Sequence, residues 1–433
     1  MNNTLLALVF VLSACCLLEF AILLKDGGRF RRILSRAKAS VKDRGLFPTL
    51  FKAPKFLLKK LLKKNQSGQP EAQSQAENSL QNTIANDDGK IRVAFLFEGG
   101  YGDFLLCANF FDYFRKKFGA DNISFDLYGT GGLKDIFNYP IPNVAIFDRK
   151  DCPFDNMARY DVFFKIAKRN QLMHADKERL LKYAPDLREY ILMCEKYAQE
   201  NKPLFEMNPR LDGLNSSVSI AQGKKRIQEA DIYGFLGVTE DFKYEFLIKE
   251  DEDAYLKSLG LVSKKFILVH RGWDAAYNKG EHVKAWSIKS CGDIIERLKK
   301  EFPNYKIVLF GVDRQQAPSA KGADIDLIGK TTLNQAKVLL KHAAVLIDNE
   351  GGMVHLRHAL KGGPSVILFG PTAKELFGYS ENKNITSNVC AHWCEWLSED
   401  WQYKCAKTGK NGHPCMDAIN SSDIISAVKS ILK

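Results

Sequence analysis

A chain of 433 residues with 45% hydrophobic content is long enough to form two or three domains with buried cores. Its net charge of +12 would suit nucleic acid only if the cations covered a folded face. Residues 25–64 carry 14 Lys and Arg against two Asp, and the remainder of the chain is close to neutral. This distribution argues against a basic folded surface and therefore against a nucleic-acid partner.

The chain begins with an apolar run, LLALVFVLSACCLLEFAILL, at residues 5–24. Its length matches the roughly 20 residues that a membrane-spanning helix needs, and Glu19 lies near its interfacial end. It lacks the basic start and the small-residue cleavage site of a signal peptide, so we expect a retained transmembrane anchor over residues 1–24, with a cleaved signal as the alternative. Because the cations follow the run, the positive-inside rule places the rest of the chain on the cytoplasmic side of the inner membrane, as a single-pass protein.

Residues 25–64 form a basic juxtamembrane segment in which Phe, Leu and Ile alternate with Lys and Arg at roughly helical spacing. This pattern is typical of amphipathic helices that lie on anionic lipid, and a solvated basic stalk is the alternative. Residues 65–89 are polar, with few large apolar side chains, which predicts a flexible linker.

From residue 90 onward, short apolar strands alternate with amphipathic helices, the pattern of an α/β protein with parallel sheets. The strands expected first are IRVAFLF, ISFDLYG, VAIFD and YDVFFKI, and those expected later are KFILVH, YKIVLFG, IDLIGK, AVLID and SVILFG. We therefore predict two Rossmann-like domains that face a cleft, over residues 90–250 and 251–433. The helix-rich, charged residues 168–212 are expected to be an insertion in the first domain.

The first expected strand ends in a glycine turn, EGGYGD, at residues 98–103. This turn fits neither GxGxxG nor the GxxxxGK[ST] phosphate loop, which disfavours dinucleotide and P-loop chemistry. Asp103 is expected in the first turn of the following helix, after Gly102. A carboxylate at this position can cap the helix, or it can act as a general base at the mouth of the cleft.

A second turn, DNEGGMVHL, follows the expected strand AVLID. Here Glu350 ends the strand, Gly351 and Gly352 allow close approach of a ligand, and His355 lies one turn into the next helix. The helix N-terminus could bind a phosphate, and Glu350 could accept hydrogen bonds from sugar or ribose hydroxyls. The alternative is a tightly packed corner with a hydrogen-bonded core histidine.

Several motifs in order across residues 91–433 resemble glycosyltransferase family 9, the lipopolysaccharide heptosyltransferase family, which has the two-domain GT-B fold. The motifs that carry the resemblance are FLFEGGYGDFLL, ILVHRG, VKAW, IGKTTL, DNEGGMVHLRHAL and LFGPT. The anchor and linker lie outside the resemblance. Each motif is weak alone, but six in the right order are specific.

The resemblance implies roles for individual residues. Asp103 would be the base that deprotonates the acceptor hydroxyl, and Lys284 would neutralise the diphosphate of the donor. The other residues implied to line the donor site or its loops are Asp313, Glu350, Gly351, Gly352, His355, Gly370, Thr372, Gly102, Arg271 and Gly272. Catalysis of this kind proceeds by inversion in a single displacement and requires no cofactor.

The sequence also departs from the family pattern. Glu350 and Gly351 stand where Asp followed by Ser or Thr is usual, and Arg271 replaces a residue that is usually proline. The loop WDAAYNKGEHV before Lys284 is longer than usual. These departures affect the expected donor site, so ADP-heptose is the family default for the donor rather than a deduction.

Four of the ten cysteines cluster near the C-terminus, at Cys390, Cys394, Cys405 and Cys415. In a cytoplasmic protein these are expected to be thiols or metal ligands rather than disulfides. Four thiolates could hold a structural zinc or iron ion, although their spacing matches no recognised zinc knuckle.

Together these features predict an inverting glycosyltransferase at the inner membrane. It would move a sugar, heptose by default, from a nucleotide-diphosphate donor to a lipopolysaccharide-type, lipid-linked or other glycan acceptor. Two alternatives are a metal-containing protein O-glycosyltransferase and a non-catalytic membrane scaffold that retains the fold.

Overall fold

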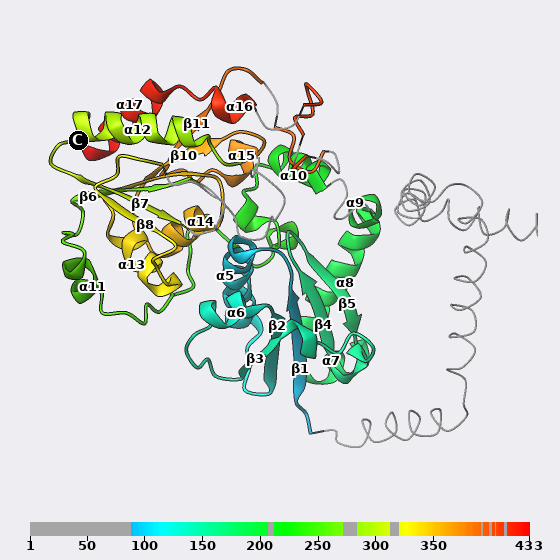
Figure 1. Ribbon diagram of the computed structural model, residues 1–433. Coiled ribbons are helices and arrows are strands. Elements are labelled where there is room, and N and C mark those ends of the chain that lie inside the picture. Colours follow the sequence, from blue (N-terminus) through cyan, green and yellow to red (C-terminus); the bar gives the residue numbers. More distant parts are fainter. Residues whose placement is uncertain are drawn as a thin grey trace, which may run out of the picture. The chain divides into compact units, whose positions relative to one another are not determined.

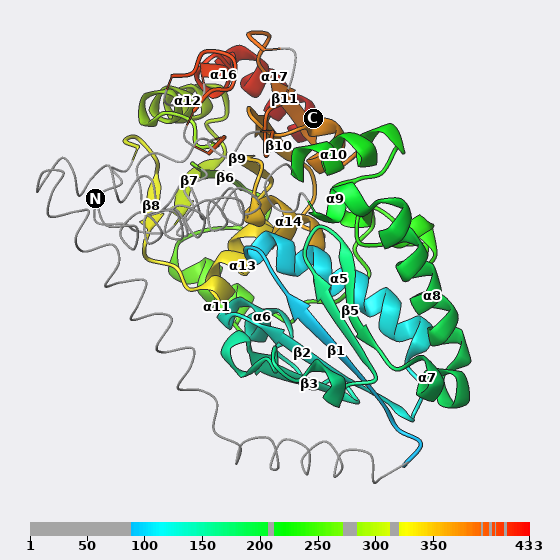
Figure 2. The same ribbon diagram turned by 90° about the vertical axis from the view of Figure 1, so that its right-hand side faces the viewer.

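The computed structural model describes residues 88–206, 212–271, 284–311, 320–390, 393–397, 401–402, 404–410 and 414–433, which belong to one compact unit (Figures 1 and 2). The predicted anchor, the basic segment and nearly all of the linker lie outside these residues, as do Gly272 and Asp313. Among the described residues, no helix is both long enough and apolar enough to cross a membrane.

The first sheet has five strands in the order β3-β2-β1-β4-β5. The strands are β1 (Ile91–Phe97), β2 (Ile123–Gly129), β3 (Val144–Asp148), β4 (Val162–Ile166) and β5 (Asn170–Ala175). The first four are parallel to their neighbours, and β5 pairs antiparallel with β4 at one edge. The helices that follow in this half are α5 (Tyr101–Phe118), α6 (Gly131–Ile136), α7 (Lys177–Tyr183), α8 (Pro185–Glu200), α9 (Lys202–Glu206) and α10 (Asp212–Ala221).

One face of the first sheet is covered by α5, α6 and α8. Eleven of the 18 residues of α5 are buried, which requires apolar residues around most of the helix rather than along a single stripe. On the strand side, Phe95 of β1 stacks on Phe164 of β4 and meets Phe114 of α5 edge to face. The helix α8 adds Tyr190, whose ring is 5.6 Å from that of Phe114, so α8 belongs to the core of this sheet.

The opposite face of the first sheet has a smaller apolar cluster. Its buried residues are Ala94, Leu96, Tyr128, Cys152, Tyr160 and Phe163. The covering segment contains two short 3-10 helices, η1 (Arg149–Asp151) and η2 (Met157–Arg159). The first sheet therefore has its long helices on one side only.

The second sheet has six strands, all parallel, in the order β11-β10-β9-β6-β7-β8. The strands are β6 (Phe266–His270), β7 (Lys306–Gly311), β8 (Ile325–Ile328), β9 (Val345–Asn349), β10 (Ser365–Phe369) and β11 (Lys383–Thr386). Helices in this half are α11 (Glu252–Ser258), α12 (Ile288–Glu301), α13 (Leu333–His342), α14 (Gly352–Ala359), α15 (Lys374–Phe377), α16 (Pro414–Asp417) and α17 (Ser421–Leu432). Two 3-10 helices, η3 (Arg226–Gln228) and η4 (Ile232–Gly234), precede them.

Helices cover both faces of the second sheet, which explains the continuous apolar runs of its strands. In β6, Phe266 and Leu268 join the core with α13 and α14, whereas Ile267 and Val269 join the core with α12 and α17. This alternation follows from the two-residue period of a strand. Figure 1 shows α12 and α17 on one side of the sheet and α13 and α14 on the other. The predicted α/β architecture is therefore confirmed: the second sheet is wholly parallel, and the first is parallel except for its edge strand β5.

The two sheets meet through helices rather than through strands. In both views α5 of the first half and α14 of the second half lie side by side (Figures 1 and 2). An ion pair joins the same two halves: Lys337 Nζ of α13, which is buried, lies 3.0 Å from Asp135 Oδ2 of α6. The hydroxyl of Tyr101 also donates a hydrogen bond to Asp135. The strands β1 and β9 end close to this junction, because α5 and α14 follow them directly in the chain.

Candidate functional site

The two glycine turns singled out in the sequence lie against each other. A Cβ atom added to Gly102 would lie 3.0 Å from Cα of Gly352 and 3.1 Å from Cδ2 of His355. A Cβ atom on Gly352 would lie 3.3 Å from the backbone nitrogen of Gly102. Only a residue without a side chain allows so close an approach at both positions. The N-terminal ends of α5 and α14 thus form one site, with Asp103 on one side and Glu350 on the other.

Asp103 is held in the first turn of α5. Its Oδ2 accepts a hydrogen bond of 2.9 Å from the backbone N–H of Gly100, so the side chain caps its own helix. The carboxylate folds back over Gly99, where the added Cβ would collide with Asp103, and Gly99 has a φ of +118°. The capping interpretation is therefore correct, and the side chain of Asp103 is still 36% exposed.

The other oxygen of Asp103 meets a partner that the sequence analysis did not identify. The Nη2 atom of Arg226, at the start of η3, donates to Asp103 Oδ1 at 2.7 Å. Burial opposes ionisation of this carboxyl, but Arg226, the Gly100 N–H and Lys168 outweigh it and hold the pKa of Asp103 below its ordinary value. Asp103 is thus a carboxylate at neutral pH, with both oxygens held.

The second half contributes a lysine between two buried glutamates. Lys284 Nζ lies 2.6 Å from Glu350 Oε2 and 3.5 Å from Glu395 Oε1. The ammonium also lies over the rings of Phe377 and Trp401, 5.8 and 5.7 Å from their centroids. Lys284 sits in the turn before α12, four residues ahead of its first residue. Aromatic faces and carboxylates on several sides fix the position of this cation.

Glu395 is a further residue that the sequence analysis missed. The backbone N–H groups of Cys394 and Glu395 both donate to the carbonyl of Pro371 at 2.9 Å. The Gly-Pro-Thr turn therefore anchors the loop that brings Glu395 to Lys284. Burial raises the pKa of the Glu395 carboxyl, against the lowering effect of Lys284 and Lys168.

The predicted residues of the Gly-Pro-Thr turn do not line an open site. Thr372 is buried, and a Cβ atom on Gly370 would collide with Met416 and lie 3.3 Å from Sγ of Cys415. Gly370 packs against the segment that begins α16 instead of facing a ligand. The turn positions Glu395 rather than contributing side chains of its own.

His355 is buried beside Glu350, and its Nδ1 shares a hydrogen bond of 2.7 Å with the hydroxyl of Tyr379. Burial, with Arg226 nearby, lowers the pKa of His355 to about 3. The ring is therefore neutral at physiological pH and does not supply a positive charge for a phosphate. Its contact with Gly102 makes it part of the junction between α5 and α14.

Arg271 is buried directly after β6, next to another pair that the sequence analysis missed. His270 Nδ1 lies 2.8 Å from Asp348 Oδ1, which joins the adjacent carboxyl ends of β6 and β9. Burial raises the pKa of Asp348 despite the nearby histidine. These residues border the candidate site on the side of the second sheet.

The four clustered cysteines lie near enough to influence one another's pKa. The thiol of Cys394 interacts with Cys390 and Cys405, and that of Cys415 interacts with Cys390 and Cys394. Burial raises the pKa of Cys415 to about 11, whereas hydrogen bonds involving Thr408 and Lys407 lower the pKa of Cys405 despite its burial. Within the described ranges, however, no group of three or more His, Cys, Asp or Glu side chains is arranged to hold a metal ion. The predicted metal site is thus not formed by the cysteines as placed here.

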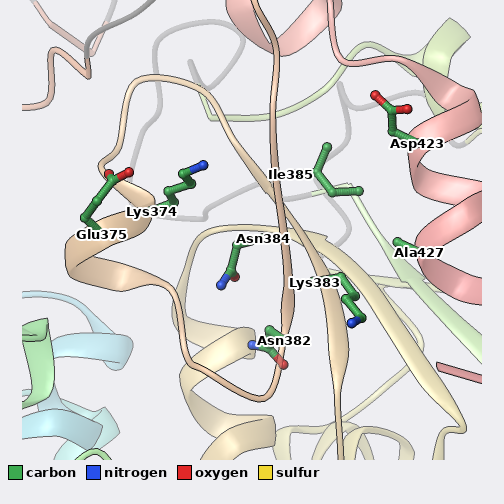
Figure 3. A pocket seen from close by; sticks show the side chains of 8 residues that line it. All are labelled: Lys374, Glu375, Asn382, Lys383, Asn384, Ile385, Asp423 and Ala427. Atoms are coloured by element: carbon green, nitrogen blue, oxygen red, sulfur yellow. The ribbon is translucent and has the colours of Figure 1, made fainter. Parts of the chain in front are cut away.

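A surface hollow of about 550 Å³ lies elsewhere, between α15, β11 and α17 (Figure 3). Its lining residues are polar or charged for the most part: Lys374, Glu375, Asn382, Lys383, Asn384, Ile385, Asp423 and Ala427. None of the residues predicted for the site lines it.

Comparison with known proteins gives one family match and several structural matches. Residues 233–404 match glycosyltransferase family 9 (heptosyltransferase). The chain is similar to the iron-containing dodecameric glycosyltransferase TibC of enterotoxigenic E. coli, with 13% identity and a TM-score of 0.50 over 79% of this chain and 77% of that one. A comparison with curated proteins finds no match.

Two further solved structures are similar to the chain. One is the ADP-heptose lipopolysaccharide heptosyltransferase II of E. coli, with 14% identity and a TM-score of 0.47 over 79% of this chain and 98% of that one. The other is a family 9 glycosyltransferase of Veillonella parvula, with 16% identity and a TM-score of 0.46 over 79% and 97%. The family match confirms the inferred resemblance over residues 233–404, which contain five of the six motifs but not FLFEGGYGDFLL. The match to TibC supports the fold.

Proposed function

We propose that the chain is a glycosyltransferase that moves a sugar from a nucleotide-diphosphate donor to an acceptor hydroxyl, with inversion and with Asp103 as the base; the match of residues 233–404 to glycosyltransferase family 9 supports this. The observation that carries this proposal is the junction of α5 and α14. There Gly102, next to the ionised Asp103, lies against Gly352, two residues after Glu350, which pairs with Lys284.

Asp103 supplies the base for the proposed reaction. Each of its oxygens has one hydrogen-bond donor in the structure, which leaves a further lone pair on each oxygen for the acceptor hydroxyl. As the hydroxyl oxygen attacks the anomeric carbon, its proton passes to the carboxylate and the bond from that carbon to the diphosphate oxygen breaks. The leaving nucleoside diphosphate takes the electron pair. A positioned base of this kind typically contributes about 10²- to 10⁴-fold to the rate.

The donor side has the groups that a leaving diphosphate needs. The first backbone N–H groups of α14 have no partner within the helix and favour an anion, and Lys284 adds a full positive charge. Lys284 is balanced by Glu350 and Glu395, so a diphosphate must draw it away from at least one of them. Glu350 would then be available for donor hydroxyls. ADP-heptose is the proposed donor, and TibC has been solved in complex with ADP-D-β-D-heptose.

We also propose that the enzyme works at the cytoplasmic face of the inner membrane on a lipopolysaccharide-type or other lipid-linked glycan. Support comes from the sequence alone, from the apolar run at residues 5–24 and the cations that follow it. An anchor of this kind would raise the effective concentration of the enzyme near an acceptor in the same membrane.

Incubation of the full chain in detergent with a panel of nucleotide sugars tests the proposal. The correct donor stabilises the protein against heat, by about 2.7 kcal/mol at a concentration of 100 times Kd. The same donor should be consumed when a truncated lipopolysaccharide is added. Failure of every nucleotide sugar to bind would contradict the proposal and favour the non-catalytic scaffold.

A metal-containing protein O-glycosyltransferase is a second candidate. The grouping of four cysteines within residues 390–415 of the sequence favours it, and TibC, the structure with a TM-score of 0.50, is iron-containing. Elemental analysis of the purified full chain discriminates between the candidates. About one iron or zinc ion per chain would support the metal-containing version, and a metal-free, active protein would contradict it.

A further inference from the structure

Asp103 lies at the open end of a chain of polar side chains that runs into the first half. Arg226 Nη2 donates to Asp103 Oδ1, Arg226 Nε lies 3.4 Å from Glu229 Oε2, and the hydroxyl of Ser219 donates to Glu229 Oε1 at 2.8 Å. Ser219 is on α10, and Arg226 and Glu229 belong to η3 and its end. The chain thus connects α10 and η3 to the first turn of α5.

Burial is uneven along this chain. The side chains of Arg226 and Glu229 are each 3% exposed, whereas that of Asp103 is 36% exposed. A buried guanidinium is tolerated only when carboxylates balance it and hydrogen bonds satisfy it. Glu229 provides a second, buried carboxyl partner for Arg226, so Arg226 has a contact that does not depend on Asp103. The exposed end of the chain is the one that faces the candidate site.

The contact between Arg226 and Asp103 has two chemical effects. It fixes one oxygen while the Gly100 N–H fixes the other, so the carboxylate cannot rotate about its terminal bond. It also keeps Asp103 ionised, with help from Lys168, which follows β4. Two further titratable groups interact with Asp103, namely Cys107 on α5 and His355 on α14.

We propose that Arg226 is a positioning residue that orients the Asp103 carboxylate toward the acceptor hydroxyl, and that Glu229 and Ser219 hold Arg226 in that orientation. The inference rests on the proposed function of Asp103 as the base. Arg226 acts through Asp103 and does not itself touch the substrate.

The test compares variants that separate orientation from stability. Replacement of Arg226 alone would remove a positive charge from beside the buried Glu229 carboxyl, so the main variant is the double substitution Arg226→Gln with Glu229→Gln. Arg226→Lys is the conservative variant, because it keeps the charge but cannot span both carboxylates with a planar fork. Arg179→Gln is the matched control: Arg179 pairs with Asp161 at 2.6 Å near the opposite end of β1.

We expect kcat of the double variant to fall about 10- to 100-fold, as for a misplaced catalytic group, with the KM for the donor within about twofold of wild type. In a plot of kcat against pH, the acid limb of this variant should move to higher pH. Without Arg226 the ionised form of Asp103 is less favoured, so the pKa of Asp103 rises. Arg226→Lys should have an intermediate kcat. Arg179→Gln should lose stability but keep the wild-type kcat and pH profile.

Wild-type kcat in the double variant would overturn the proposal, and so would a lower kcat with an unchanged acid limb. The second result would mean that Arg226 merely stabilises the fold. Asp103→Asn is measured in parallel to keep the two hypotheses apart. If that variant turns over normally, the base assignment itself fails, whatever the Arg226 variants do.

Discussion

The close contact between Gly102 and Gly352 predicts that adding one methyl group at Gly102 will lower both the stability and the turnover of the enzyme. In Gly102→Ala the new Cβ would lie 3.0 Å from Cα of Gly352 and 3.1 Å from the ring of His355, both closer than van der Waals contact. Backbone cannot give way as a flexible side chain does, so α5 and α14 must move apart by a few tenths of an ångström. Overpacking of this kind costs about 1–3 kcal/mol, which exceeds the gain of at most about 1 kcal/mol from replacing a helical glycine.

The same displacement moves Asp103 away from the donor side. Small misplacements of catalytic groups slow the chemical step strongly, so we expect kcat to fall on the order of 10-fold. The matched control is Gly292→Ala in α12, where the added Cβ meets nothing within 4 Å and should stabilise the helix by about 0.5–1 kcal/mol. Chemical denaturation gives the stabilities, and initial rates with the identified donor give kcat.

Wild-type stability and turnover in Gly102→Ala would refute the close packing of the two helix ends. A loss of equal size in Gly292→Ala would show that the effect is not specific to the junction.

Two further predictions concern charges at the site. Glu395→Gln should bind nucleoside diphosphate more tightly, by about 1–2 kcal/mol, because it removes a negative charge 3.5 Å from Lys284; calorimetry that shows equal or weaker binding would contradict this. His355→Gln should reduce the loss of stability in acid. Burial lowers the pKa of His355 to about 3 in the folded protein, against about 6.5 when unfolded, so its contribution is fully present above about pH 6.5 and is lost as the pH falls toward 3. Between pH 6.5 and 5 the wild type should lose about 1.5–2 kcal/mol more than the variant in urea unfolding; parallel losses would refute the neutral, buried histidine.

Local sequence was sufficient for the elements that depend on local patterning. The apolar run IRVAFLF and the glycine turn after it placed Asp103 in the first turn of a helix, where the structure has it. Likewise the strand ending at Asn349, with two glycines after Glu350, predicted the start of α14. These features follow from periodicity and turn chemistry within a few residues. The edge strand β5 was not expected, because NQLMHA shows no clear alternation of apolar and polar residues.

The partners of the site residues were not predictable in the same way. Arg226 lies 123 positions from Asp103, and Glu395 lies 111 positions from Lys284. In the sequence, Arg226 and Glu395 are each one charged residue among many, and neither lies in a recognisable motif. The tertiary fold brings η3 against α5, and hydrogen bonds to the carbonyl of Pro371 help to hold Glu395 in place. The sole sequence signal for Glu395 is its place within the cysteine cluster, for which the sequence leaves free thiols and metal ligands both open.

The central claim is that Asp103 is the base of sugar transfer, and the substitution Asp103→Asn tests it most directly. Asparagine preserves the size of the side chain and can still accept from the Gly100 N–H, but it cannot take a proton from the acceptor. We predict that donor affinity, measured by calorimetry, stays within about twofold of wild type, while single-turnover transfer falls by at least about 10²-fold. A transfer rate within tenfold of wild type at unchanged donor affinity would contradict the claim.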